Sequence, residues 1–124
     1  MSLHPKARLQ SFAYAFRGIA QLLRTEANAR IHALAAVAVV AAGFSIGIDR
    51  FEWLAIVLAV TAVWCAEAFN TAIESVCDAV SQDHHPKIER AKDIAAGAVL
   101  LAAIGSVGVG IIVFGPPLLA LLVP

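Results

Sequence analysis

The sequence predicts an all-α membrane protein with an N-terminal amphipathic surface helix followed by three transmembrane helices. Of its 124 residues, 60% are hydrophobic and only 15% are charged, and the mean hydropathy is +0.82. A soluble domain is usually about 45–50% apolar. The excess lies in long uncharged runs, which is typical of membrane spans. The length favours a single domain over residues 1–124.

The surface helix is predicted at about residues 6–26. Apolar side chains such as Leu9, Phe12 and Phe16 recur at steps of three and four, while basic residues such as Arg17 fall mainly on the rest of the helix. This pattern fits a helix lying on the membrane with its apolar face down.

The three spans are predicted at about residues 31–48, 53–73 and 94–114. The helical pattern of the second span continues through Asp78, so this helix should project beyond the bilayer. We expect Gly115, Pro116 and Pro117 to end the third helix. Residues 118–123 would then form a short interfacial tail.

The basic residues predict the orientation. Five precede the first span and three lie between the second and third, whereas the turn between the first two spans has only Arg50 and none follows the last span. Cytoplasmic flanks of spans carry an excess of Lys and Arg. The N-terminus and the loop of residues 81–92, where Pro86 acts as a helix breaker, are therefore expected on the cytoplasmic side.

Four polar residues of the second span form what we call the acidic stripe: Glu67, Asn70, Glu74 and Asp78. Steps of three, four and four place them on one helix face. A carboxylate deep in a bilayer costs about 2.5–3.5 kcal/mol, and Glu67 has apolar residues on both sides. Because three thin helices cannot enclose such a face, we expect an oligomer with the stripe at a helix–helix interface.

The stripe also requires positive charge, which Lys92, Arg30 or a divalent metal could supply. Hard carboxylate ligands suit Mg²⁺, which retains waters and shares phosphate oxygens. Glu26 should lie at the same membrane level on another helix. The alternative for Glu26 is a surface ion pair with Arg30, four residues on.

Structural alternatives also exist for the other charged candidates. Asp78 and Glu74 could be solvated on the cytoplasmic extension. Asp93 could cap a helix N-terminus, and Lys92 could extend toward the membrane surface. Spacing alone does not distinguish these structural roles from a role in a functional site.

Several classes of function are disfavoured. The nine basic residues balance the nine acidic ones, so the net charge indicates no nucleic-acid partner. No glycine-rich phosphate-binding motif is present in the sequence. His84 and His85 have no third soft ligand nearby, which makes zinc improbable.

Two motifs carry a resemblance to a known family. Glu67-Ala-Phe-Asn70-Thr71-Ala-Ile-Glu74, followed by Asp78, resembles the signature of the prokaryotic diacylglycerol kinase and undecaprenol kinase family. So does Ala91-Lys92-Asp93-Ile-Ala-Ala-Gly97. The similarity begins at Phe12-Ala-Tyr14-Ala-Phe-Arg-Gly18 and extends to about Phe114.

The resemblance implies an ATP- and Mg²⁺-dependent lipid kinase of the bacterial plasma membrane. It would be a homotrimer with active sites shared between subunits, acting on the hydroxyl of a lipid alcohol. Glu67 would be the catalytic base and Asn70 would support the site. Glu26 and Glu74 would hold Mg²⁺. The ATP contacts would be Tyr14, Glu26, Glu74, Asp83, His84, His85, Lys92 and Asp93. Arg8 lies one residue out of register with the family's first-helix arginine.

The acceptor is predicted from smaller motifs. Asn28-Ala-Arg30-Ile-His32 and His85-Pro86 look more like the undecaprenol branch, which favours a polyprenol over diacylglycerol. A cation-pathway subunit is a competing class, although its polar residues should cross the full membrane depth. A non-catalytic membrane scaffold is another, and it gives no reason for Glu67 in an apolar setting.

Overall fold

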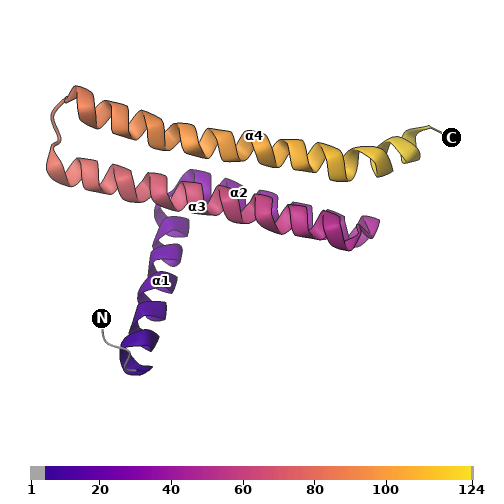
Figure 1. Ribbon diagram of the computed structural model, residues 1–124, viewed down its shortest axis with the longest axis horizontal. Helices are drawn as coiled ribbons and strands as arrows, with labels where there is room; N and C mark the ends of the chain where they lie inside the picture. The colour runs from indigo at the N-terminus through magenta and orange to yellow at the C-terminus, as the bar shows by residue number, and fades with distance from the viewer. Residues whose placement is uncertain (1–4, 124) are drawn as a thin grey trace.

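The computed structural model describes residues 5–123, and this part of the chain contains four α-helices. They are α1 (Pro5–Thr25), α2 (Ala27–Ile46), α3 (Arg50–Val80) and α4 (Pro86–Leu122). Helices α3 and α4 run side by side, and α2 lies along α3 (Figure 1). Helix α1 projects away, across the direction of the other three (Figure 1).

The three predicted spans are confirmed as helices, since α2, α3 and α4 are each long and apolar enough to cross a membrane. Helix α3 continues to Val80, as its polar extension predicted. In α1, large apolar side chains such as Phe12 and Phe16 are exposed, and Leu22 is the one buried residue. This unpartnered apolar surface fits a helix that rests on a membrane.

The turn between α2 and α3 is fixed by local chemistry. Gly47 ends α2 with a φ of 76°, a left-handed conformation that glycine adopts without strain. Asp49 then caps α3 by accepting from the backbone N–H groups of Phe51 and Glu52, and the Glu52 side chain completes a capping box. This short turn makes α2 and α3 antiparallel neighbours.

The expected end of the last span was wrong. Helix α4 continues through Pro116 and Pro117 to Leu122, and it bends near its C-terminal end (Figure 1). Proline removes a helical hydrogen bond but its φ suits a helix, and apolar spans tolerate it with local adjustment. The segment 118–122 is therefore helical and continuous with the span, not a separate tail.

Pro86 was also misinterpreted as a breaker within a longer loop. It is the first residue of α4, a position where its missing N–H costs nothing. The His85 side chain caps this end by accepting from the backbone N–H of Lys87. The connection between α3 and α4 therefore covers only residues 81–85, and Lys92 lies within α4.

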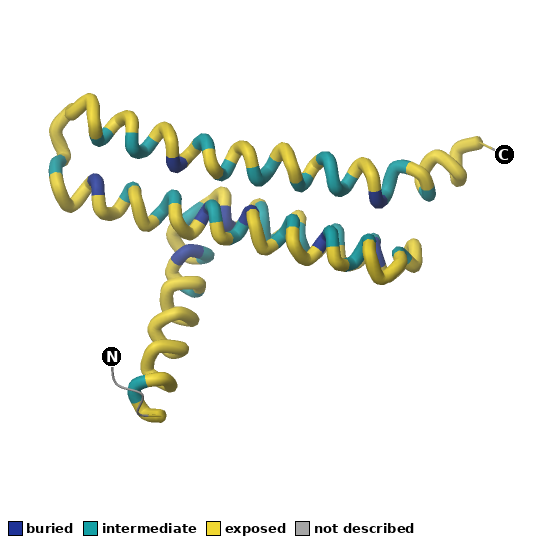
Figure 2. The backbone as a smooth tube through the Cα atoms, viewed as in Figure 1, coloured by how far each residue is buried: buried dark blue, intermediate teal, exposed yellow. Residues whose placement is uncertain are grey.

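Few residues of the described chain are buried (Figure 2). Three of them, Ile56, Val63 and Glu67, lie on α3 at helical spacing and mark the face that packs against the other helices. Most large apolar side chains of the spans are exposed. Lipid or further protein must cover them, because soluble monomers rarely expose patches of this extent.

Candidate functional site

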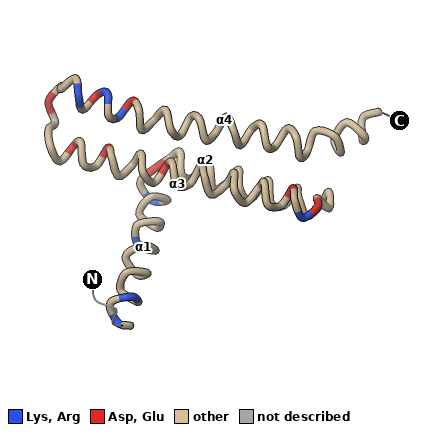
Figure 3. Tube along the Cα trace, viewed as in Figure 1, with Lys and Arg blue, Asp and Glu red and all other residues tan. Residues whose placement is uncertain are grey.

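The acidic stripe occupies the C-terminal half of α3 (Figure 3). Glu67 is only 2% exposed, Asn70 and Glu74 are half-buried, and Asp78 is exposed. The stripe therefore leads from the protein interior to the surface over about three turns. Glu67 is the one charged residue among the buried residues of the described chain.

The polar atoms of the stripe are incompletely paired. The Asn70 Nδ2 donates to Glu74 Oε1 at 3.1 Å, which orients the Glu74 carboxylate. Within the described residues, Glu67 Oε2, Asn70 Oδ1 and the Thr71 hydroxyl are buried without a hydrogen-bond partner. Leaving such groups unpaired is costly. A ligand or a second subunit would remove this cost.

Glu26 lies within electrostatic range of Glu67 although it belongs to another part of the chain. It is the single residue between α1 and α2, which we call the elbow. Its Oε1 accepts a hydrogen bond from the Thr25 hydroxyl at 3.0 Å. Glu26 and Glu74 both lie near enough to Glu67 for their charges to act on its carboxylate. The elbow and the middle of α3 therefore converge at Glu67.

Arg30 does not pair with Glu26, so that alternative is not what the structure contains. Its Nη1 instead donates to the backbone carbonyls of Arg24, at 3.0 Å, and Leu23, at 3.3 Å. These carbonyls belong to the last turn of α1, where helical partners run out. Arg30 thus joins α1 to α2 beside the elbow, and its bonded nitrogen does not contact the acidic stripe.

A second site, the loop pocket, lies between the end of α3 and the start of α4, with a cavity volume of about 410 Å³. Its lining contains the predicted residues Asp78, Asp83, His84, His85, Lys92 and Asp93, together with Ser81, Gln82, Ile88 and Glu89. The sequence prediction missed the last four, although the helical register of α4 places Glu89 beside this group.

Lys92 is already paired within the loop pocket. Its Nζ lies 2.6 Å from Asp78 Oδ1, across the two helices. His84 Nε2 and Glu89 Oε2 lie 3.6 Å apart. Asp93 lies about two turns inside α4 and is exposed, so the idea that it caps this helix was wrong. Likewise, Lys92 reaches an acidic partner instead of extending freely.

Tyr14 and Arg8 lie elsewhere. Both are exposed on α1, and the Arg17 guanidinium lies 5.5 Å from the centre of the Tyr14 ring. Because α1 projects away from the α3–α4 connection (Figure 1), a single chain does not bring Tyr14 to the loop pocket. The predicted nucleotide contacts are therefore divided among α1, the elbow, the acidic stripe and the loop pocket.

The candidate metal ligands fit an ion that is shared with a phosphate ligand better than an ion held by protein side chains alone. In the described part of the chain, no group of three or more His, Cys, Asp or Glu side chains is close enough to hold a metal. Glu26 and Glu74 lie within electrostatic range of Glu67 but do not form such a group with it. A pair of carboxylates suits Mg²⁺, which completes its shell with waters and phosphate oxygens.

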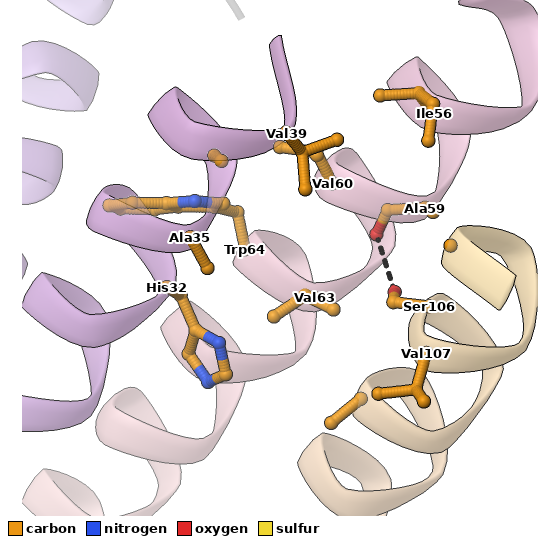
Figure 4. Close-up of a pocket in the computed structure, with 13 residues that line it drawn as sticks. His32, Ala35, Val39, Ile56, Ala59, Val60, Val63, Trp64, Ser106 and Val107 are labelled. Atoms are coloured by element: carbon orange, nitrogen blue, oxygen red, sulfur yellow. Dashed lines mark hydrogen bonds between the residues drawn. The ribbon is translucent and has the colours of Figure 1, made fainter. Parts of the chain in front are cut away.

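An apolar cavity between α2, α3 and α4, here called the groove, was not predicted from the sequence (Figure 4). Its volume is about 330 Å³. It is lined by His32, Ala35, Ala36, Val39, Ile56, Ala59, Val60, Val63, Trp64, Ala103, Ser106, Val107 and Gly110. Only the small size of several lining residues could have signalled it, and small residues also mark tight helix packing.

Comparisons with known proteins identify the family. The family described as prokaryotic diacylglycerol kinase matches residues 13–114. An undecaprenol kinase of Bacillus subtilis is 42% identical over 88% of this chain and 89% of that protein. A diacylglycerol kinase of Synechocystis is 43% identical over 93% of this chain and 66% of its own length. One from Escherichia coli is 28% identical over 80% of this chain and 81% of its own. The chain belongs to the prokaryotic diacylglycerol kinase family of lipid kinases.

Proposed function

We propose that this protein transfers the γ-phosphoryl group of ATP, with Mg²⁺, to the hydroxyl of a membrane lipid alcohol, most favourably undecaprenol. The observation that carries the proposal is Glu67, a carboxylate that is 2% exposed and has one oxygen without a partner in the described chain. It lies where the apolar groove meets the polar stripe. An acceptor hydroxyl arriving from the membrane would meet this oxygen first.

Glu67 is the proposed general base. Its free Oε2 accepts the proton of the lipid hydroxyl while the hydroxyl oxygen attacks the γ-phosphorus, and ADP leaves with the electrons of the broken P–O bond. Phosphoryl transfer depends mostly on positioning and charge neutralisation. A base held by burial and by helix packing supplies the positioning.

Glu26 and Glu74 are the proposed Mg²⁺ ligands. When bound, the ion would neutralise charge on the ATP phosphates. The hydrogen bond from Asn70 holds the Glu74 carboxylate, and the elbow holds Glu26 within electrostatic range of Glu67. Asn70 is therefore proposed to support the ion site rather than to touch the acceptor.

The loop pocket is the proposed nucleotide site. Lys92 would release Asp78 and bind phosphate oxygens, while Asp83, His84, His85 and Asp93 would contact the nucleoside. A cavity of about 410 Å³ lies within the range of small-molecule pockets. Its cytoplasmic position follows from the orientation that the basic residues predict.

Assembly as a homotrimer is part of the proposal. It would allow Tyr14 and the α1 surface of one subunit to approach the loop pocket of another. It would also cover exposed apolar faces of the spans and satisfy the buried polar atoms of the stripe. A single chain offers no such cover to these groups.

The acceptor is proposed from the motif around Arg30 and His32, because the comparisons with the Bacillus and Synechocystis proteins give nearly equal identities. Diacylglycerol is thus the second candidate. A cation pathway is disfavoured because the groove is almost entirely apolar where a pathway would need polar groups.

The decisive test is phosphate transfer from labelled Mg-ATP by purified protein in mixed micelles, with undecaprenol and diacylglycerol offered side by side. We expect labelled undecaprenyl phosphate in excess over phosphatidic acid. A reversed ratio would move the assignment to diacylglycerol. If neither lipid is labelled by protein that assembles normally, the proposed function is wrong for both.

A further inference from the structure

The groove continues the acidic stripe into the membrane. On α3, the lining residues Ile56, Val60 and Val63 lie on the same helix face as Glu67, and Val63 is one turn from it. On α2, His32 is the lining residue nearest the start of the helix and so marks the same end of the groove as Val63 on α3. The reacting end of the proposed site and the mouth of the groove are therefore contiguous.

The dimensions of the groove suit one chain. Its lining on α3 runs from Ile56 to Trp64, a rise of about 12 Å along the helix. The cavity of about 330 Å³ has room for roughly ten groups the size of a water molecule. It therefore has room for a segment of about ten carbons, which is two isoprene units.

The chemistry of the lining indicates hydrocarbon without ester groups. The Ser106 hydroxyl, one of the few polar groups in the groove, already donates to the Ala59 carbonyl at 3.2 Å (Figure 4). The remaining polar side chains of the lining, His32 and Trp64, lie near the cytoplasmic end. Deeper in the groove the lining leaves no free side-chain donor for an ester carbonyl, so burying an ester there would carry a cost. A polyprenol is hydrocarbon directly behind its hydroxyl.

We propose that the groove holds the first ten or so carbons of a single-chain lipid alcohol, so that its hydroxyl meets Glu67. This inference rests on the kinase function proposed above and names its acceptor class. A second copy of this chain is the competing occupant, and the test below includes it.

A larger side chain in place of Gly110 would block the deep end of the groove. It lines the far end, and a Cβ added there would meet nothing within 4 Å. Gly105, on the same helix, has equally open surroundings but does not line the groove. Gly110→Leu and Gly105→Leu are therefore a matched pair. From Ala103 at the mouth to Gly110 the helix rises about 10 Å, beyond the reach of a five-carbon alcohol.

The kinetic test compares a long polyprenol with five-carbon prenol. We expect Gly110→Leu to raise KM for the long alcohol about tenfold and to change KM for prenol less than twofold, while Gly105→Leu changes neither. Equal losses on both alcohols, or no loss on either, would overturn the proposal.

Occupancy can be measured without catalysis. The chain has two tryptophans, and Trp53 packs against Phe44 at the other end of α3, with 4.8 Å between ring centroids. A Trp53→Phe protein leaves Trp64 as the fluorescent reporter in the groove. A long alcohol brominated near its hydroxyl, at low mole fraction in an unbrominated bilayer, should quench Trp64, and Gly110→Leu should weaken the quenching severalfold.

These readouts separate the two proposals. Quenching that Gly110→Leu weakens, in protein that phosphorylates no lipid, would keep the groove as a chain site while the kinase function fails. Active protein without quenching would overturn the groove assignment alone. Equal quenching by a brominated diglyceride would overturn the single-chain assignment. Loss of assembly in Gly110→Leu, with no quenching by any lipid, would show that a second copy fills the groove.

Discussion

The two polar regions of this protein differ in how their charges are satisfied. At Glu67 the carboxylate is 2% exposed and one of its oxygens has no hydrogen-bond partner in the described chain. In the loop pocket, Lys92 and Asp78 lie 2.6 Å apart, partly exposed to solvent. The Glu67 carboxylate is buried and has an oxygen without a partner, whereas Lys92 must leave Asp78 before it can bind a ligand. Substitutions should therefore act strongly at Glu67 and more mildly in the loop pocket.

The largest effect is expected from Glu67→Gln. The amide keeps the size and burial of the side chain but cannot take a proton, and general-base catalysis contributes about 10²–10⁴-fold. We expect kcat for lipid phosphorylation to fall about 10³-fold with little change in KM for ATP, measured with labelled ATP in mixed micelles. Asp49→Asn, at the opposite end of α3, is the control. Retention of a tenth of the activity by Glu67→Gln would remove it as the base.

Lys92→Gln should have the next largest effect. Loss of the ammonium removes a phosphate ligand but leaves the base in place, so KM for ATP should rise about tenfold to thirtyfold while kcat falls less. Lys87→Gln, at an exposed position of the first turn of α4, serves as the matched control. An equal rise in KM in both variants would indicate a general charge effect on ATP binding instead of a specific contact.

Arg30→Ala tests the elbow. Without the guanidinium, the carbonyls of Leu23 and Arg24 lose their donor, so α1 should hold Glu26 less firmly. We expect a fall of about fivefold in kcat/KM for Mg-ATP and a higher Mg²⁺ concentration for half-maximal rate, both partly restored in Arg30→Lys. Arg24→Ala keeps its backbone carbonyl and should change neither. Unchanged Mg²⁺ dependence in Arg30→Ala would confine this residue to a structural role.

The smallest effect is expected from Asp78→Asn. It removes the charge that Lys92 must leave, and exposed ion pairs contribute little to stability. KM for ATP should fall, by no more than about threefold, and thermal stability should stay nearly the same. A large rise in KM would instead make Asp78 a nucleotide contact in its own right, which would bring the two regions closer in character.

Some features could be predicted locally. Helical spacing placed Glu67, Asn70 and Glu74 on one face, and the structure adds the hydrogen bond that joins Asn70 to Glu74. The helical nature of the spans followed from the length of the apolar runs. Local propensity alone predicted that all three prolines interrupt or end helices, and this prediction was wrong for each of them. Pro86 opens a helix, whereas Pro116 and Pro117 lie within one.

The number of spans, the extension of α3 and the acidic stripe all follow from the amino-acid sequence alone, because hydrophobic length and helical period are properties of short segments. Which charged groups meet depends instead on how the helices pack together. The Arg30 side chain donates to backbone carbonyls of α1 and not to Glu26, and Lys92 pairs with Asp78. Residues from three helices together line the groove. Partner choice and cavities depend on how separate helices are packed, and spacing along one helix carries no information about that.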